Sequence, residues 1–169
     1  MFHSKAQKIV SYIVFGIYVI LLIWLILFKF STNFHDLPRI RNINLIPYGE
    51  TVVINGKIFF GEIFWNILVF VPLGVYLSIF KYNWPFVKKA VPCFLLSFLF
   101  EIIQYVFAIG ASDITDLIGN TLGGIAGIAI WTLFKRLFKE RFITIINSIG
   151  LTVEVLAVLM LGILFVANR

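Results

Sequence analysis

The chain has 169 residues, of which 61% are hydrophobic and 13% are charged, and its mean hydropathy is +1.02. Soluble domains are about half apolar and a quarter charged, so this composition excludes an ordinary soluble protein. One cysteine excludes an internal disulfide, and two distant histidines with one cysteine do not form a zinc site, so we expect no metal and no cofactor. The net charge of +6 is interpreted as membrane topology, and no nucleic-acid partner is expected.

Five segments are apolar and long enough to span a bilayer, which takes about 20 residues. They are residues 9–28, 61–80, 90–109, 114–134 and 145–167, which predict one all-α domain over residues 1–169, a polytopic membrane helix bundle. The first is too long for a signal peptide core and is kept as a span. Pro72 predicts a kink in the second, Pro92 is expected in the first turn of the third, and Glu154 is expected at the membrane interface.

The basic residues of the loops predict the orientation of these spans. Nine of them fall on one side and five on the other, and cytoplasmic loops carry the excess of Lys and Arg. The larger group is Lys5, Lys8, Lys81, Lys88, Lys89, Lys135, Arg136, Lys139 and Arg141. We therefore expect a cytoplasmic N-terminus, an extracellular C-terminus and outward-facing loops after the first and third spans.

The first outward loop, residues 30–60, contains an Asn55-Gly56 turn dipeptide between two β-prone runs, which is a hairpin signal. The loop is either a surface hairpin or a half-inserted lid over a polar site. Its arginines, Arg39 and Arg41, either pair with acidic neighbours (Asp36 and Glu50) or bind a phosphate, for which the planar guanidinium is suited.

Polar side chains gather in residues 97–127 and at one position of the second span. In the predicted topology they fall near the outer ends of three helices, where we expect them to meet in one pocket. They are Asn66, Glu101, Gln104, Asp113, Asp116 and Asn120. A carboxylate inside a membrane helix costs about 3 kcal/mol, so such residues commonly mark functional sites.

Each of these residues also has a structural interpretation. Glu101 can bond to Gln104 or Asn66 across helices, and Asp113, or Ser112 before it, can cap the fourth helix. Asn120 and three nearby glycines (Gly123, Gly124 and Gly127) can serve close helix packing. If functional, the carboxylates are a general acid and base, a cation site, or acceptors for the hydroxyls and amides of a ligand.

Four stretches resemble the VanZ-like family of membrane proteins: LIWLILFK, NLIPYGE, NILVFVPLG and FEIIQYVFAIGASDITDLIGNTLGG. The resemblance covers about residues 20–130, and the fifth span matches only in hydropathy. It carries the polar pattern of the family onto Asn44, Pro47, Asn66, Pro72, Glu101, Gln104, Asp113, Asp116, Asn120 and Gly124. Many members have an arginine just before the aspartates, where this chain has Gly110, Ala111 and Ser112.

The resemblance implies a bacterial cell-membrane protein linked to low-level resistance to teicoplanin and related lipoglycopeptides. Three functions are compatible with the residues. The first is binding of an amphipathic drug or a lipid-linked cell-wall precursor in an outward polar cavity. The second is an enzyme that modifies a cell-surface lipid or peptide, with Glu101, Asp113 or Asp116 as acid and base. The third is a proton- or cation-coupled transporter, against which five spans without a visible repeat argue.

Overall fold

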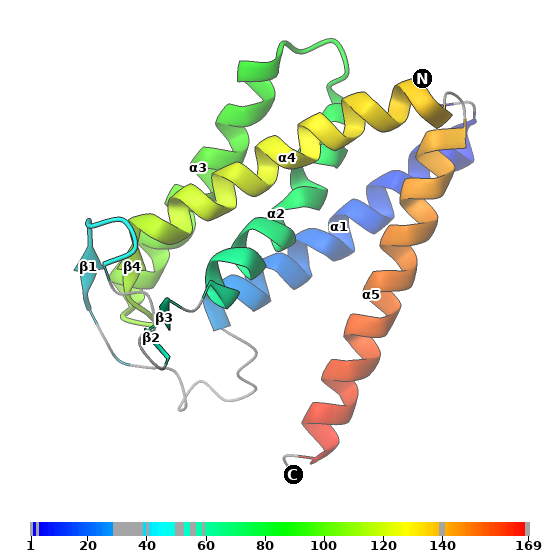
Figure 1. The fold of residues 1–169 in the computed structure, drawn as a ribbon. Helices are drawn as coiled ribbons and strands as arrows, with labels where there is room; N and C mark the ends of the chain where they lie inside the picture. The colour runs from blue at the N-terminus through cyan, green and yellow to red at the C-terminus, as the bar shows by residue number, and fades with distance from the viewer. Residues whose placement is uncertain are drawn as a thin grey trace.

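The computed structural model describes residues 2, 4–28, 39, 41–49, 53–54, 57–58, 60–138 and 141–167. Within these residues the chain forms five long helices, each long and apolar enough to cross a membrane (Figure 1). They are α1 (Lys5–Phe28), α2 (Gly61–Phe80), α3 (Phe86–Phe107), α4 (Ile114–Phe138) and α5 (Phe142–Ala167). This confirms the predicted all-α architecture and the multi-pass membrane class.

The bounds of α2 agree with the prediction, whereas α1 begins four residues earlier and α4 ends four residues later than predicted. The start of α3 also lies four residues earlier than predicted. That helix begins at Phe86 after the N-cap residue Pro85, so Pro92 lies inside the helix and not in its first turn, and this prediction was wrong. Pro85 has φ −64 and ψ 160, an extended conformation that suits the residue before a helix. The α2 helix continues through Pro72, and the Tyr18 hydroxyl donates to the Val69 carbonyl (2.8 Å) in the preceding turn.

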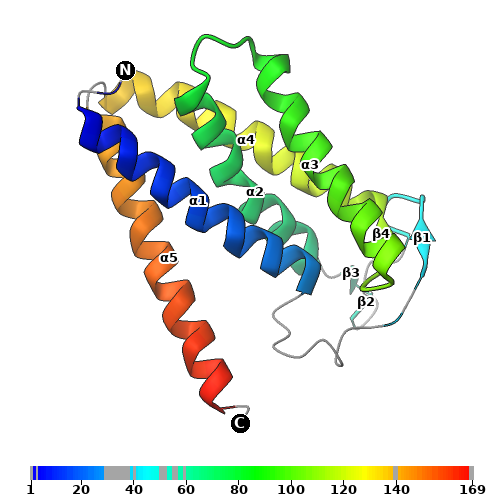
Figure 2. The same ribbon diagram turned by 180° about the vertical axis from the view of Figure 1, so that it is seen from behind.

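The α2 and α4 helices pack with their backbones in close contact, because glycines face the seam. A Cβ added at Gly123 or Gly127 would collide with the carbonyl oxygen of Ile67 or Val71, and one at Gly74 would collide with that of Gly124. Small residues permit such close approach between helices in lipid. In both views α2 lies among α1, α3 and α4, whereas α5 lies beside α1 and diverges from the bundle toward its C-terminal end (Figures 1 and 2).

In the described part of the chain, two apolar cores hold the bundle. One joins α1, α2, α4 and the start of α5 around Val14, Tyr76 and Phe142. The other joins α1, α2 and α3 around Leu22, Phe70 and Phe100. The buried apolar side chains of α5, Phe142 and Ile143, belong to the first core, so the apolar packing of that helix is concentrated near its N-terminal end.

Among the described residues, four two-residue strands lie at the end of the bundle where α4 begins (Figure 1). The strand β1 (Ile43–Asn44) pairs in parallel with β4 (Ser112–Asp113), and β2 (Val53–Ile54) pairs antiparallel with β3 (Lys57–Ile58). The second pair confirms the predicted hairpin pairing, although the turn residues, Asn55 and Gly56, lie outside the described residues. The first pair ties the loop after α1 to the loop after α3.

Candidate functional site

Glu101 and Asp113 join the end of α3 to the start of α4. The side chain of Glu101, which is only 7% exposed, accepts the backbone N–H of Asp113 on Oε2 (2.9 Å). The backbone carbonyl of Glu101 accepts the hydroxyl of Ser112 (2.7 Å). The Asp113 carboxylate in turn accepts the side-chain amide of Asn44 from β1 (3.2 Å). Two carboxylates and an amide from three segments therefore meet at this end of the molecule.

Asp113 also caps α4, as predicted. Its Oδ1 accepts the backbone N–H of Thr115 (2.7 Å), which satisfies one of the free donors of the first helical turn. The Thr115 hydroxyl accepts the backbone N–H of Tyr48 (3.0 Å), and the Asn42 carbonyl accepts the N–H of Ser112 (2.9 Å). Residues 42–48, which we call the cover segment, are thus bonded over the first turn of α4.

Asp116, one turn further along α4, bonds to α2. Its Oδ1 accepts the side-chain amide of Asn66 (2.6 Å). The two acidic residues at the start of α4 therefore face different neighbours. Asp113 bonds to the cover segment and α3, and Asp116 bonds to α2. Capping alone accounts for Asp113 and leaves Asp116 with a separate role between helices.

The amides below this level have partners that the sequence did not indicate. Asn120 donates to the hydroxyl of Ser97 on α3 (3.0 Å), deeper in the bundle. Gln104 donates to the Ile26 carbonyl at the end of α1 (3.1 Å), so its side-chain amide is directed to α1. Both residues are buried, and Oδ1 of Asn120 and Oε1 of Gln104 have no hydrogen-bond partner among the described residues. Glu101, Ser97 and Gln104 share one face of α3 at helical spacing.

The two arginines of the outward loop differ in their contacts. Arg41 donates to the Val106 carbonyl in the last turn of α3 (3.3 Å), where a cation is favoured by the helix dipole. Arg39 is exposed and makes no hydrogen bond to any other described residue. Their proposed partners, Asp36 and Glu50, lie outside the described residues.

The packing interpretation of the α4 glycines is supported by the seam with α2 and by a third contact. A Cβ at Gly124 would approach Sγ of Cys93 on α3 to 2.5 Å. Gly123, Gly124 and Gly127 therefore bring α4 close to both of its neighbours, and this close approach positions Asp116 opposite Asn66.

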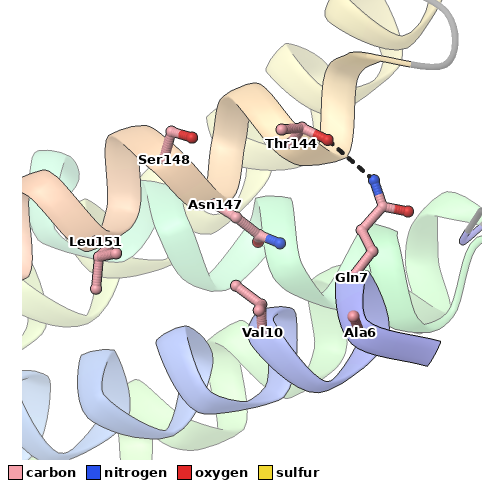
Figure 3. Close-up of a pocket in the computed structure, with 7 residues that line it drawn as sticks. All are labelled: Ala6, Gln7, Val10, Thr144, Asn147, Ser148 and Leu151. Atoms are coloured by element: carbon pink, nitrogen blue, oxygen red, sulfur yellow. Dashed lines mark hydrogen bonds between the residues drawn. The ribbon is translucent and has the colours of Figure 1, made fainter. Parts of the chain in front are cut away.

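A second polar cluster lies at the opposite end, between α1, α2 and α5. Asn147 donates to the Ser11 hydroxyl (2.8 Å), and its Oδ1 accepts the Tyr76 hydroxyl (3.2 Å). Beside it an open pocket of about 280 Å³ lies between α1 and α5, where Gln7 donates to Thr144 (Figure 3). The pocket is lined by the N-terminal halves of α1 and α5, which lie at the other end of the bundle from the start of α4 (Figure 1).

Glu154 was expected at the interface but lies in the middle of α5 and is only 6% exposed. Sequence reasoning also missed the serine and threonine partners of the site. Ser112 was considered only as an alternative cap of the fourth helix, and Ser97 and Thr115 were given no role. Their signal was their spacing from Glu101, Asn120 and Asp113, which becomes informative only once the helix pairing is known.

We call the end of the bundle that holds Glu101, Asp113 and Asp116 the carboxylate end. Its side chains can accept hydrogen bonds and carry negative charge. Glu101, Asp113 and Asp116 come from the facing ends of two helices, and an ionised carboxylate only accepts hydrogen bonds. Among the described residues no group of three His, Cys, Asp or Glu side chains is placed to hold a metal ion.

Comparisons with known proteins find a matching family and a relative of this chain. The VanZ/LLP1 family profile matches residues 15–135, which span α1 to α4 with the cover segment. Protein VanZ of Enterococcus faecium is 36% identical over 152 residues, covering 88% of this chain and 91% of that protein. No solved structure matches the chain. The chain therefore belongs to the VanZ/LLP1 family of membrane proteins.

Proposed function

We propose that this protein confers low-level resistance to teicoplanin and related lipoglycopeptides by binding an amphipathic ligand at the carboxylate end of α3 and α4. The ligand is either the drug or a lipid-linked cell-wall precursor. The observation that carries the proposal is the bond of Glu101 to Asp113 beneath the cover segment, whose Asn44 also bonds to Asp113. The bond between Asp116 and Asn66 lies one helical turn further along α4.

Energetics support a functional interpretation of this cluster. Interhelical hydrogen bonds within membranes average only about 0.6 kcal/mol, so they offset little of the cost of keeping carboxylates in an apolar bundle. A cluster kept only for stability would be replaced by apolar packing at little cost. A ligand that carries hydroxyls and amides gives these acceptors a further use.

The predicted orientation also supports the proposal, because lipoglycopeptides and cell-wall precursors meet outside the membrane. The excess of basic residues at the other end predicts that the cover segment and the Asp113 turn face the exterior. Cysteine substitution of exposed Arg39, in a Cys93→Ser background, tests this placement. Labelling of intact cells by a membrane-impermeant maleimide is expected, and labelling only after lysis would contradict the orientation.

The binding test uses the full-length protein in nanodiscs, with teicoplanin and lipid-linked precursor as separate ligands. Glu101→Gln and Asp116→Asn should each weaken binding of one ligand by about tenfold, the loss of one charge-assisted hydrogen bond. Glu62→Gln is the matched control, because Glu62 is an exposed acid in the first turn of α2. Absence of binding of either ligand to the wild type would contradict the proposal. Mass spectrometry of the recovered ligand separates binding from the enzymatic alternative, which requires a changed mass.

A further inference from the structure

A group of basic and aromatic side chains at the other end of the bundle does more than set orientation. Lys89 was interpreted as one of the loop cations that face water, yet it is 4% exposed. Its ammonium lies 4.3 Å from the ring centroid of Trp131 on α4 and 3.4 Å from the Tyr82 carbonyl. Lysines are almost never so buried unless they are paired.

A second lysine approaches the same aromatic ring. The ammonium of Lys135 lies 4.9 Å from the Trp131 centroid and 5.8 Å from that of Tyr82. Two positive charges on one indole repel each other, and a cation–π contact offsets about 0.5–2 kcal/mol for each. An anion between the lysines would offset the repulsion more directly.

The sequence places few acidic residues where they can serve as that anion. Positions 63–100 and 117–139, which include α3 up to Phe100 and most of α4, contain no Asp or Glu. Glu140 follows α4 and lies outside the described residues. Within the described residues, neither Lys89 nor Lys135 forms a salt bridge.

Two further features, the indole N–H of Trp131 and the start of α3, favour an anionic ligand. Trp131 is only 7% exposed, and its buried indole Nε1 has no hydrogen-bond partner among the described residues. The α3 helix has no side-chain cap at Pro85 and no acid in its first turn, where Lys89 lies. Free N–H groups at the N-terminus of a long helix favour an anion.

We propose that Lys89, Lys135, Trp131 and the first turn of α3 bind the phosphate of an anionic lipid headgroup. A lipid is favoured over free phosphate because the cluster joins two membrane helices and is bordered by Tyr82 and Trp84, which suit the bilayer interface. Basic pockets between membrane helices bind such headgroups. The site is separate from the proposed drug or precursor site and does not depend on it.

The test is native mass spectrometry of the delipidated full-length protein, titrated with phosphatidylglycerol, phosphatidylcholine or inorganic phosphate. The wild type should bind phosphatidylglycerol preferentially. Lys135→Gln and Lys89→Gln should each weaken that binding about fivefold, and Trp131→Phe, which removes the N–H and keeps a ring, about twofold. Arg136→Gln is the matched control, since Arg136 is an exposed neighbour of Lys135 outside the first turn of α3, and it should leave binding unchanged.

Equal binding of phosphatidylglycerol and phosphatidylcholine would overturn the proposal, as would an equal loss in Arg136→Gln. Displacement of phosphatidylglycerol by inorganic phosphate at similar concentration would overturn the lipid assignment. Lys135 is exposed, so Lys135→Gln keeps the test decisive even if Lys89→Gln fails to fold. Lys89→Arg should bind phosphatidylglycerol about as well as the wild type, because it keeps the positive charge.

Discussion

The α2–α4 pair and the α1–α5 pair are held together by different means. Glycines bring the backbones of α2 and α4 into contact along the seam, with Asn66 and Asp116 bonded at one end. The α1–α5 pair meets through apolar side chains and the Ser11–Asn147 bond near one end, and then the helices diverge (Figure 2). The tight pair lies within the region matched by the family profile, whereas α5 lies beyond it. Asp116 and Asn66 of the candidate site therefore lie on the tightly packed pair.

The largest effect is expected from breaking the tight seam. Gly127→Ala places a methyl group against the Val71 carbonyl and should destabilise the protein by about 3 kcal/mol or more, because overpacking against backbone cannot be relieved by a rotamer change. Thermal unfolding in detergent measures this loss. Gly162→Ala and Gly16→Ala are matched controls, because a Cβ added at either glycine would meet no heavy atom within 4 Å. Both substitutions should be neutral or slightly stabilising. Equal losses at all three positions would contradict the seam.

Glu101 sharpens the comparison, since it fixes the turn that leads into the tight pair. Glu101→Leu leaves the Asp113 N–H without its acceptor and should cost about 2 kcal/mol of stability. Glu101→Gln keeps an acceptor oxygen, so its free energy of unfolding should stay near that of the wild type. Chemical denaturation of both variants measures the difference. A matching loss in the Gln variant would mean that the negative charge itself stabilises the fold.

A smaller effect on stability is expected from weakening the α1–α5 pair. Asn147→Leu removes the bonds to Ser11 and Tyr76, and membrane hydrogen bonds of this kind are worth about 0.6–1.7 kcal/mol. We expect a modest loss of stability and a wider α1–α5 separation, measured by spin labels on the two helices. Thr152→Val, which removes a hydroxyl bonded only within α5, is the control. An unchanged separation would show that apolar packing alone holds α5.

The smallest effect concerns the cover segment. Thr115→Val removes the acceptor of the Tyr48 N–H and should cost less than about 1 kcal/mol, because that N–H can turn to water. Hydrogen exchange of the Tyr48 amide should become faster, with little change in unfolding temperature. Thr121→Val, whose hydroxyl bonds within α4, should leave the exchange unchanged. Unaltered exchange in Thr115→Val would show that this bond does not hold the cover segment.

The sequence predicted the parts of the molecule that depend on local signals. Apolar runs predicted the five spans, and Asp113 before a helical pattern predicted the cap. The Asn55-Gly56 dipeptide predicted the β2–β3 pairing, and the glycines of α4 predicted close packing. Each of these signals lies within a few residues of the structure it specifies.

The placements that the sequence did not predict depend on which segments are neighbours in the fold. The β1–β4 pair joins two-residue strands from distant loops, and so short a strand has no periodicity to detect. The amide of Gln104 is directed to α1, Lys89 packs on Trp131, and Glu154 is buried, and none of these placements follows from hydropathy. The start of α3 was placed too late because charged Lys88 and Lys89 resemble a loop.

Teicoplanin susceptibility of bacteria that express the full-length protein tests the central claim most directly. The comparison is between wild type, Glu101→Gln and Glu62→Gln at matched levels in the membrane. We predict that the wild type and Glu62→Gln raise the inhibitory concentration of teicoplanin, whereas Glu101→Gln does not. Protection by Glu101→Gln equal to that of the wild type would contradict a functional role for the carboxylate end of α3 and α4.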